Sequence, residues 1–156
     1  MKRIIMYLED NAYLNRHTVE KLNEQLVPKG YEVKGFHRIE QANECIKDVL
    51  SGKLTNIQIC CIITDLHMAD EWLDEHKTET NGGMFSGWIW LKYYVFNKLP
   101  NKPHIIIYSG YVEDLKEYYM CEEELRQKDI ATVSKGGNDN QGLKGLYKTI
   151  KDKLGL

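Results

Sequence analysis

Several side chains able to do acid, metal or phosphate chemistry stand directly after short apolar runs of the sequence. In chain order they are Glu9, Asp10, Asp65, Ser109 and Lys135. Three carboxylates held close together repel one another and raise each other's pKa unless a cation lies among them. Carboxylate oxygens are ligands for a hard divalent ion such as Mg²⁺, and an ammonium group could offset part of their charge or bind an anion beside the metal.

The apolar runs themselves are the strands that must position these side chains. They fall at residues 3–8, 31–36, 58–64, 104–108 and 131–134. Between and after them, apolar residues recur with the 3.6-residue period of a helix, at about 14–26, 42–50, 84–96, 112–127 and 143–154. This alternation predicts an α/β domain with a mainly parallel sheet, here a (βα)5 unit.

Right-handed crossovers leave few ways to arrange five such units. The commonest is a three-layer sandwich with strand order 2-1-3-4-5 and helices on both faces of the sheet. In that order the carboxyl ends of strands 1, 3, 4 and 5 surround one crevice, so we expect the five reactive side chains to meet there. We expect residues 1–156 to form a single domain.

The charge of the chain argues against two classes of partner. Its 156 residues carry a formal net charge of −2 at pH 7, which gives no basic field for nucleic acid or for an acidic membrane. The first apolar run is too short for a secretory signal, because acidic residues follow it at Glu9 and Asp10. No run approaches the ~18 apolar residues of a membrane span. We therefore expect a cytoplasmic protein, whose four cysteines, without CxxC spacing, are reduced thiols.

The residues at the strand ends make the sequence resemble a response-regulator receiver domain of two-component phosphorelays. The resemblance covers essentially the whole chain and rests on four motifs, which are YLEDN with Glu9 and Asp10, IITDLHM with Asp65, IIIYSGY with Ser109 and Gly110, and TVSKG with Lys135. Each motif alone is weak, but four in the right order are specific. The resemblance implies a flavodoxin-like, CheY-like fold and a stand-alone receiver without an output domain.

The resemblance also implies how a phosphoryl group would be taken up. Asp65 would be the nucleophile that accepts it from a phosphohistidine on a sensor histidine kinase or histidine phosphotransfer protein. Glu9, Asp10 and Asp65 would hold Mg²⁺, with Mn²⁺ as the alternative, together with the backbone carbonyl of His67. Lys135 would pair with a phosphoryl oxygen, and phosphorylation would change binding to a downstream protein target.

A second group of residues would form the switch and the rim of the site. In receivers a hydroxyl such as that of Ser109 moves to hydrogen-bond the phosphoryl group, and a small neighbour such as Gly110 leaves space for it. His67 and Tyr111 stand at the rim, where side chains tune hydrolysis. The family usually has an aromatic residue at the position of Thr132, so the sequence departs from the usual aromatic-coupled switch.

The stretch after Asp65 is a larger departure from the family. Sixteen residues separate Asp65 from Gly82, against the ~2 to 6 usual for such a loop, which predicts an insertion at about residues 68–82. It could act as a partner-specific lid. Its polar side chains are expected to be solvated rather than to bind a transition metal, whereas Trp72 and Leu73 either fold back on the domain or anchor a partner.

Two other functions are compatible with the same fold. A pseudo-receiver would keep the fold as an interaction module without phosphorylation. A metal-dependent phosphatase would need a second aspartate two residues after the nucleophile, where His67 stands. The intact acidic set and Lys135 favour a phosphorylated receiver that is not an enzyme, apart from the chemistry on its own Asp65.

Overall fold

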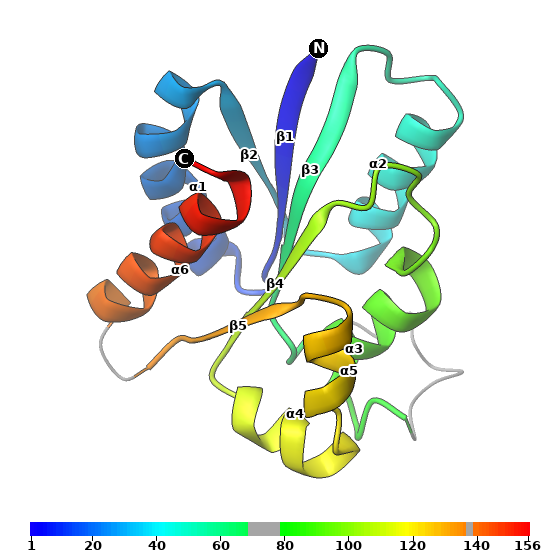
Figure 1. Cartoon of the computed structure of the whole chain (residues 1–156), viewed down its shortest axis with the longest axis vertical. Helices are drawn as coiled ribbons and strands as arrows, with labels where there is room; N and C mark the ends of the chain where they lie inside the picture. Colours follow the sequence, from blue (N-terminus) through cyan, green and yellow to red (C-terminus); the bar gives the residue numbers. More distant parts are fainter. Residues whose placement is uncertain (69–78, 137–138) are drawn as a thin grey trace.

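The computed structural model describes residues 1–68, 79–136 and 139–156, and within them it confirms the predicted sheet. The five strands are β1 (Lys2–Leu8), β2 (Tyr31–Phe36), β3 (Ile57–Thr64), β4 (His104–Ser109) and β5 (Ala131–Ser134). All neighbouring strands pair in parallel, in the order β2-β1-β3-β4-β5 (Figure 1). The carboxyl ends of the strands therefore lie at one edge of the sheet.

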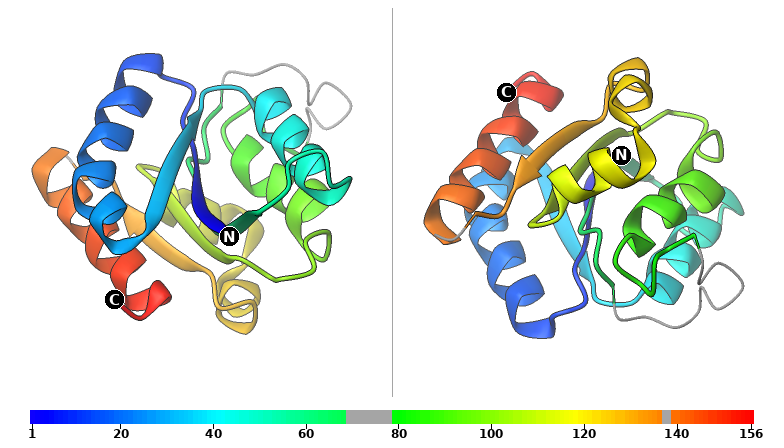
Figure 2. Two further views of the ribbon diagram at one scale, coloured as in Figure 1. Left: turned by 90° about the horizontal axis from the view of Figure 1, so that it is seen from above. Right: turned by 90° about the horizontal axis from the view of Figure 1, so that it is seen from below.

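Helices cover both faces of the sheet. They are α1 (Ala12–Leu26), the short helix η1 (Val27–Lys29), α2 (Ile39–Leu50), α3 (Ser86–Trp90), the π-helical turn η3 (Leu91–Val95) that continues α3, α4 (Val112–Tyr119), α5 (Glu122–Gln127) and α6 (Asp139–Leu154). Helices α1 and α6 lie on one face, and α2, α3, α4 and α5 lie on the other (Figure 2). No helix within the three described ranges is long and apolar enough to cross a membrane.

The sheet separates two hydrophobic cores, because successive side chains of a strand point to opposite faces. In β1, Ile4, Met6 and Leu8 pack in the core with α2 and α3, whereas Ile5 and Tyr7 pack in the core with α1 and α6. All five side chains are buried. The near-continuous apolar run at the start of the sequence is thus the signature of a central strand covered on both sides.

The predicted helix at 112–127 is divided in two by the structure. Met120, whose φ is 49°, lies in the left-handed region and is exposed, so the chain leaves the helix there. On a continuous helix Cys121 and Leu125 would face away from the side that carries Val112 and Leu115, because each residue turns the helix by about 100°. The break lets all four side chains reach the same core.

Close packing brings the start of α3 against the end of β3. A Cβ atom on Gly87 would lie 1.9 Å from the carbonyl oxygen of Asp65 and 3.0 Å from Thr64 Oγ1. The Gly87 N–H donates a hydrogen bond to the carbonyl of Leu66 at 2.9 Å. Only glycine allows helix and strand to approach this closely, so Gly87 sets the position of the backbone at Asp65.

Replacing Gly87 with alanine should lower the free energy of unfolding by about 1–3 kcal/mol, because the new methyl group meets backbone atoms that cannot rotate away. Gly145→Ala in α6 is the matched control, since its Cβ would lie at an ordinary 3.5 Å from Val133 and alanine favours helix. Urea denaturation of both variants measures the difference. A Gly87→Ala protein as stable as Gly145→Ala would contradict the packing argument.

Candidate functional site

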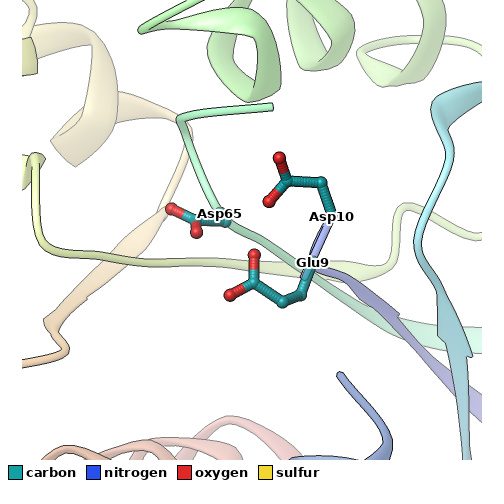
Figure 3. Close-up of side chains that lie close together, drawn as sticks. All are labelled: Glu9, Asp10 and Asp65. Atoms are coloured by element: carbon teal, nitrogen blue, oxygen red, sulfur yellow. The ribbon is translucent and has the colours of Figure 1, made fainter. Parts of the chain in front are cut away.

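The register of the sheet places two carboxylates side by side. Leu8 of β1 pairs with Thr64 of β3, so the residues that follow, Glu9 and Asp65, leave the sheet next to each other. Together with Asp10 they bring carboxylate oxygens within 4.8 Å of one another (Figure 3). Glu9 and Asp65 are buried and Asp10 is half-buried, which confines much of the negative charge to a site with little water.

Lys135, directly after β5, partly neutralises this charge. Its Nζ donates a hydrogen bond to Glu9 Oε1 at 2.8 Å and another to Asp65 Oδ2 at 2.6 Å. Burial opposes the charged form of the lysine, but the charge of Asp65 and the hydrogen bonds to both carboxylates outweigh it and raise the pKa of Lys135. The ammonium group therefore stays charged and bridges two of the three carboxylates.

Glu9 is the most perturbed acid of this group. Its burial, and then the charge of Asp65, raise its pKa to about 7, although the hydrogen bond from Lys135 acts in the opposite direction. Its second oxygen, Oε2, is buried and has no hydrogen-bond partner among the described residues. An unpaired buried carboxylate oxygen beside two further carboxylates fits a divalent cation that prefers oxygen ligands.

The carboxylate of Asp65 is held in one orientation. Its Oδ1 accepts a hydrogen bond from the backbone N–H of Leu66 at 2.7 Å, and its Oδ2 accepts the bond from Lys135. Its own backbone is tied on both sides, because its N–H donates to the carbonyl of Leu8 at 3.0 Å and its carbonyl accepts from Thr64 Oγ1 at 2.8 Å. Both oxygens of Asp65 are therefore held in a fixed geometry.

A buried asparagine that the sequence analysis missed fixes the backbone of Glu9. Asn15, inside α1, donates hydrogen bonds from Nδ2 to the carbonyls of Glu9 at 3.0 Å and Phe36 at 2.9 Å. Glu9 directly follows β1 and Phe36 ends β2, and the Phe36 carbonyl also accepts from the Glu9 N–H at 3.1 Å, so Asn15 supplies the additional donor that the two chain segments share. Gly35 makes room, since a Cβ there would lie 2.0 Å from Asn15 Oδ1. One sequence signal existed, because Asn15 is a polar residue on the same helix face as the apolar residues Leu22 and Leu26.

The predicted switch residues lie at the end of the neighbouring strand β4. Ser109 is fully buried, and its hydroxyl oxygen accepts a hydrogen bond from the backbone N–H of Tyr111 at 3.1 Å. A Cβ on Gly110 would meet no atom within 4 Å, so this side of the crevice is open. The exposed ring of His67 lies 6.0 Å from the ring of Tyr111, centroid to centroid, which places both at the rim.

Several solved structures with a similar fold are response-regulator receivers. Similar ones are the phosphorylated cyanobacterial phytochrome response regulator RcpA (15% identity, 97% of this chain and 93% of that chain, TM-score 0.55) and a receiver domain protein from Clostridium thermocellum (14%, 98% and 94%, TM-score 0.54). A receiver protein from Sinorhizobium medicae is 15% identical over 96% of this chain and 95% of its own, with a TM-score of 0.53. This chain has the receiver-domain fold. At such identities the likeness shows the fold, and the chemistry must be argued from the chain's own residues.

The sequence matches no protein-family model and no curated protein. Its departures from the usual receiver pattern are also visible in the structure. Thr132 is half-buried in β5 and pairs with Ile107, in the place where receivers usually carry an aromatic ring. An aromatic ring beside Lys135 comes from β4, because Nζ lies 5.5 Å from the centroid of buried Tyr108.

The two ends of the long stretch after Asp65 lie side by side and are hydrogen-bonded to each other. The N–H of Met68 donates to the carbonyl of Gly83 at 3.2 Å, and Ser86 Oγ hydrogen-bonds the carbonyls of both residues. Buried Thr80 accepts from the N–H groups of Gly83 and Phe85. The predictions for Trp72 and Leu73, and for the polar side chains at residues 69–78, lie outside the described residues.

Replacing Lys135 with methionine should raise the pKa of Glu9 above its present value of about 7, by roughly one unit or more. The ammonium group now favours the ionised form of Glu9, and its loss leaves burial and the charge of Asp65 unopposed. Lys153→Met is the matched control, because Lys153 pairs with Asp129 instead. Carboxyl ¹³C NMR across a pH titration measures the shift, and an unchanged or lower pKa in Lys135→Met would contradict the assignment.

Proposed function

We propose that this protein is a phospho-accepting receiver of a two-component phosphorelay. In this proposal Asp65 takes a phosphoryl group from a phosphohistidine of a sensor histidine kinase or histidine phosphotransfer protein, and the modified protein then binds a downstream protein target. The observation that carries the proposal is the carboxylate of Asp65, held between Lys135 and the Leu66 N–H beside a second buried and partly unpaired carboxylate. The receiver-domain fold of the neighbours supports it.

The chain's own residues account for each part of the transfer. A carboxylate oxygen of Asp65 attacks phosphorus, the new oxygen–phosphorus bond forms as the bond to the histidine nitrogen breaks, and the imidazole leaves with the electron pair of that bond. Lys135 lies 2.6 Å from Asp65 Oδ2, so it can exchange that contact for one with a phosphoryl oxygen. The Leu66 N–H keeps the carboxylate oriented while this happens.

In the same proposal Glu9, Asp10 and Asp65, with the backbone carbonyl of His67, hold Mg²⁺, and Mn²⁺ is the alternative. Their oxygen donors, their proximity and the unpaired Glu9 Oε2 support this choice. When bound, the ion offsets the negative charge of the phosphoryl oxygens. The chemistry is confined to the chain's own Asp65, so we propose no enzymatic activity on other substrates, and we place the protein in the cytoplasm.

Ser109 is proposed as the switch. Its hydroxyl oxygen now accepts from the Tyr111 N–H, so its own proton remains available to donate to a phosphoryl oxygen. Such a movement would shift Tyr111 and the start of α4, which begins at the next residue. Because Thr132 replaces the usual aromatic residue, the change passes through β4 and α4 without rotation of a ring on β5.

Incubation with Mg²⁺ and acetyl phosphate should add one phosphoryl group, measured by intact mass, in the wild-type protein but not in Asp65→Asn. Asp48→Asn is the matched control, since this carboxylate lies in α2 and pairs with Lys53. Chelation of the metal with EDTA should abolish the gain. A wild-type protein that gains no phosphoryl group would favour the pseudo-receiver, and a gain that persists in Asp65→Asn would overturn the assignment of the acceptor.

Ser109→Ala should still be phosphorylated on Asp65, because the hydroxyl does not form the new bond, but it should lose the response of α4. The measurement is a pair of ¹H–¹⁵N NMR spectra, before and after phosphorylation, at Tyr111 and α4. In the wild type these signals should move, and in Ser109→Ala the movement should be smaller. Equal movement in both proteins would show that Ser109 is not the switch.

A further inference from the structure

An open groove lies at the edge of the sheet opposite to Asp65. It has a volume of about 320 Å³ and is lined by residues that begin four strands and by the last turn of α6, among them Arg3, Tyr31, Gln58, Lys102, His104 and Lys153. The N-terminus lies at the edge of the sheet where β1 begins (Figure 1), and Leu154, near the C-terminus, is part of the lining of the groove. A cavity of this size accepts a small organic molecule, and the proposed phosphotransfer at Asp65 does not use it.

The groove is positively charged although the chain as a whole is negative. Three cationic side chains line it, Arg3, Lys102 and Lys153, and none of the lining residues is acidic. Lys153 is paired with exposed Asp129 at the rim, at 2.8 Å. The backbone N–H of Lys102 donates to the carbonyl of Leu99, but its ammonium group forms no hydrogen bond or ion pair with any residue in the described ranges, so its charge is left for a ligand or for solvent.

The guanidinium group of Arg3 is held in one orientation by Tyr31. Its Cζ lies 4.2 Å from the centroid of the Tyr31 ring, and its Nη1 donates to the Tyr31 hydroxyl at 3.1 Å. Gly30 leaves space for the guanidinium, because a Cβ there would lie 2.6 Å from Nη2. A guanidinium fixed in this way has already lost part of its rotational freedom, so less is lost when it hydrogen-bonds an anion.

The other side of the groove is also fixed. Asn101 donates a hydrogen bond from Nδ2 to the carbonyl of Ile59 at 2.7 Å, which ties the turn before β4 to β3. Lys102 follows in the left-handed region, with φ of 44°. The imidazole of His104, at the start of β4, donates no hydrogen bond to a described residue and adds a further donor to the lining.

We propose that this groove binds a small phosphorylated molecule with at least two negative charges. Arg3 and Lys102 provide the charge that recognises phosphate, and His104 and Gln58 provide further donors. The open, mostly polar shape fits a compact phosphate ester or a diphosphate better than an apolar ligand. This site is separate from Asp65 and gives the receiver fold a place where a soluble metabolite is recognised.

Titration with pyrophosphate in the presence of EDTA, followed by ¹H–¹⁵N NMR, tests the groove without metal-dependent binding at Asp65. Signals of Arg3, Lys102 and His104 should move together, and Lys102→Asn, which keeps a residue tolerant of positive φ, should weaken binding about tenfold. Arg3→Gln should weaken it by a similar factor. Lys128→Gln is the matched control, because Lys128 lies outside the groove, over the ring of Phe96.

Two controls separate this proposal from its alternatives. Asp65→Asn should bind pyrophosphate as tightly as the wild type, and Lys102→Asn should still be phosphorylated by acetyl phosphate. Binding that sodium chloride of equal ionic strength removes completely, or that Lys102→Asn and Arg3→Gln leave unchanged, would overturn the site. Tighter binding of a short single-stranded oligonucleotide than of pyrophosphate would replace the small molecule with nucleic acid as the ligand.

Discussion

A single ammonium group, that of Lys135, joins three strands at the place where the site forms. It hydrogen-bonds Glu9, 126 residues earlier in the chain, and Asp65, 70 residues earlier, so both contacts require the whole sheet in register. Charges partly removed from water are stable only together, because the loss of one partner leaves the other with an uncompensated cost of desolvation. The protonation of Glu9 and the orientation of Asp65 therefore depend on one lysine.

Around this contact the backbone does most of the positioning. The Leu66 N–H holds one oxygen of Asp65, the carbonyl of Leu8 holds its amide, and Gly87 brings α3 close enough to fix the turn. Contacts made by the backbone do not depend on which side chains surround them. The side chains of His67 and Tyr111 at the rim can therefore change while the geometry of Asp65 is kept.

Much of this architecture could be predicted from the sequence, because parallel strands are nearly continuous apolar runs and their carboxyl ends must meet. The sequence analysis did not predict the division between α4 and α5. The sequence does indicate it, because on one continuous helix Cys121 and Leu125 would face away from Val112. Asn15 was missed for a different reason. A polar residue on the buried face of α1 marks its position, but its role depends on two carbonyls, of Glu9 and Phe36, that only the folded chain brings together. The groove at the opposite edge of the sheet could not be predicted for the same reason, since Arg3 and Lys102 are far apart in the chain and only folding brings them together.

Asn15 and Gly35 constrain each other's evolution. A side chain at position 35 would collide with the amide of Asn15. A smaller residue at position 15 would remove the side-chain donor of the buried Glu9 carbonyl and would leave the Phe36 carbonyl with the Glu9 N–H alone. Neither position can therefore change first without a loss of stability, even though one belongs to a helix and the other to a strand. Natural variants of this protein should keep Asn15 and Gly35 together or exchange both at once. Such paired exchange would mark chains in which the backbone at Glu9, directly after β1, is held by a different contact.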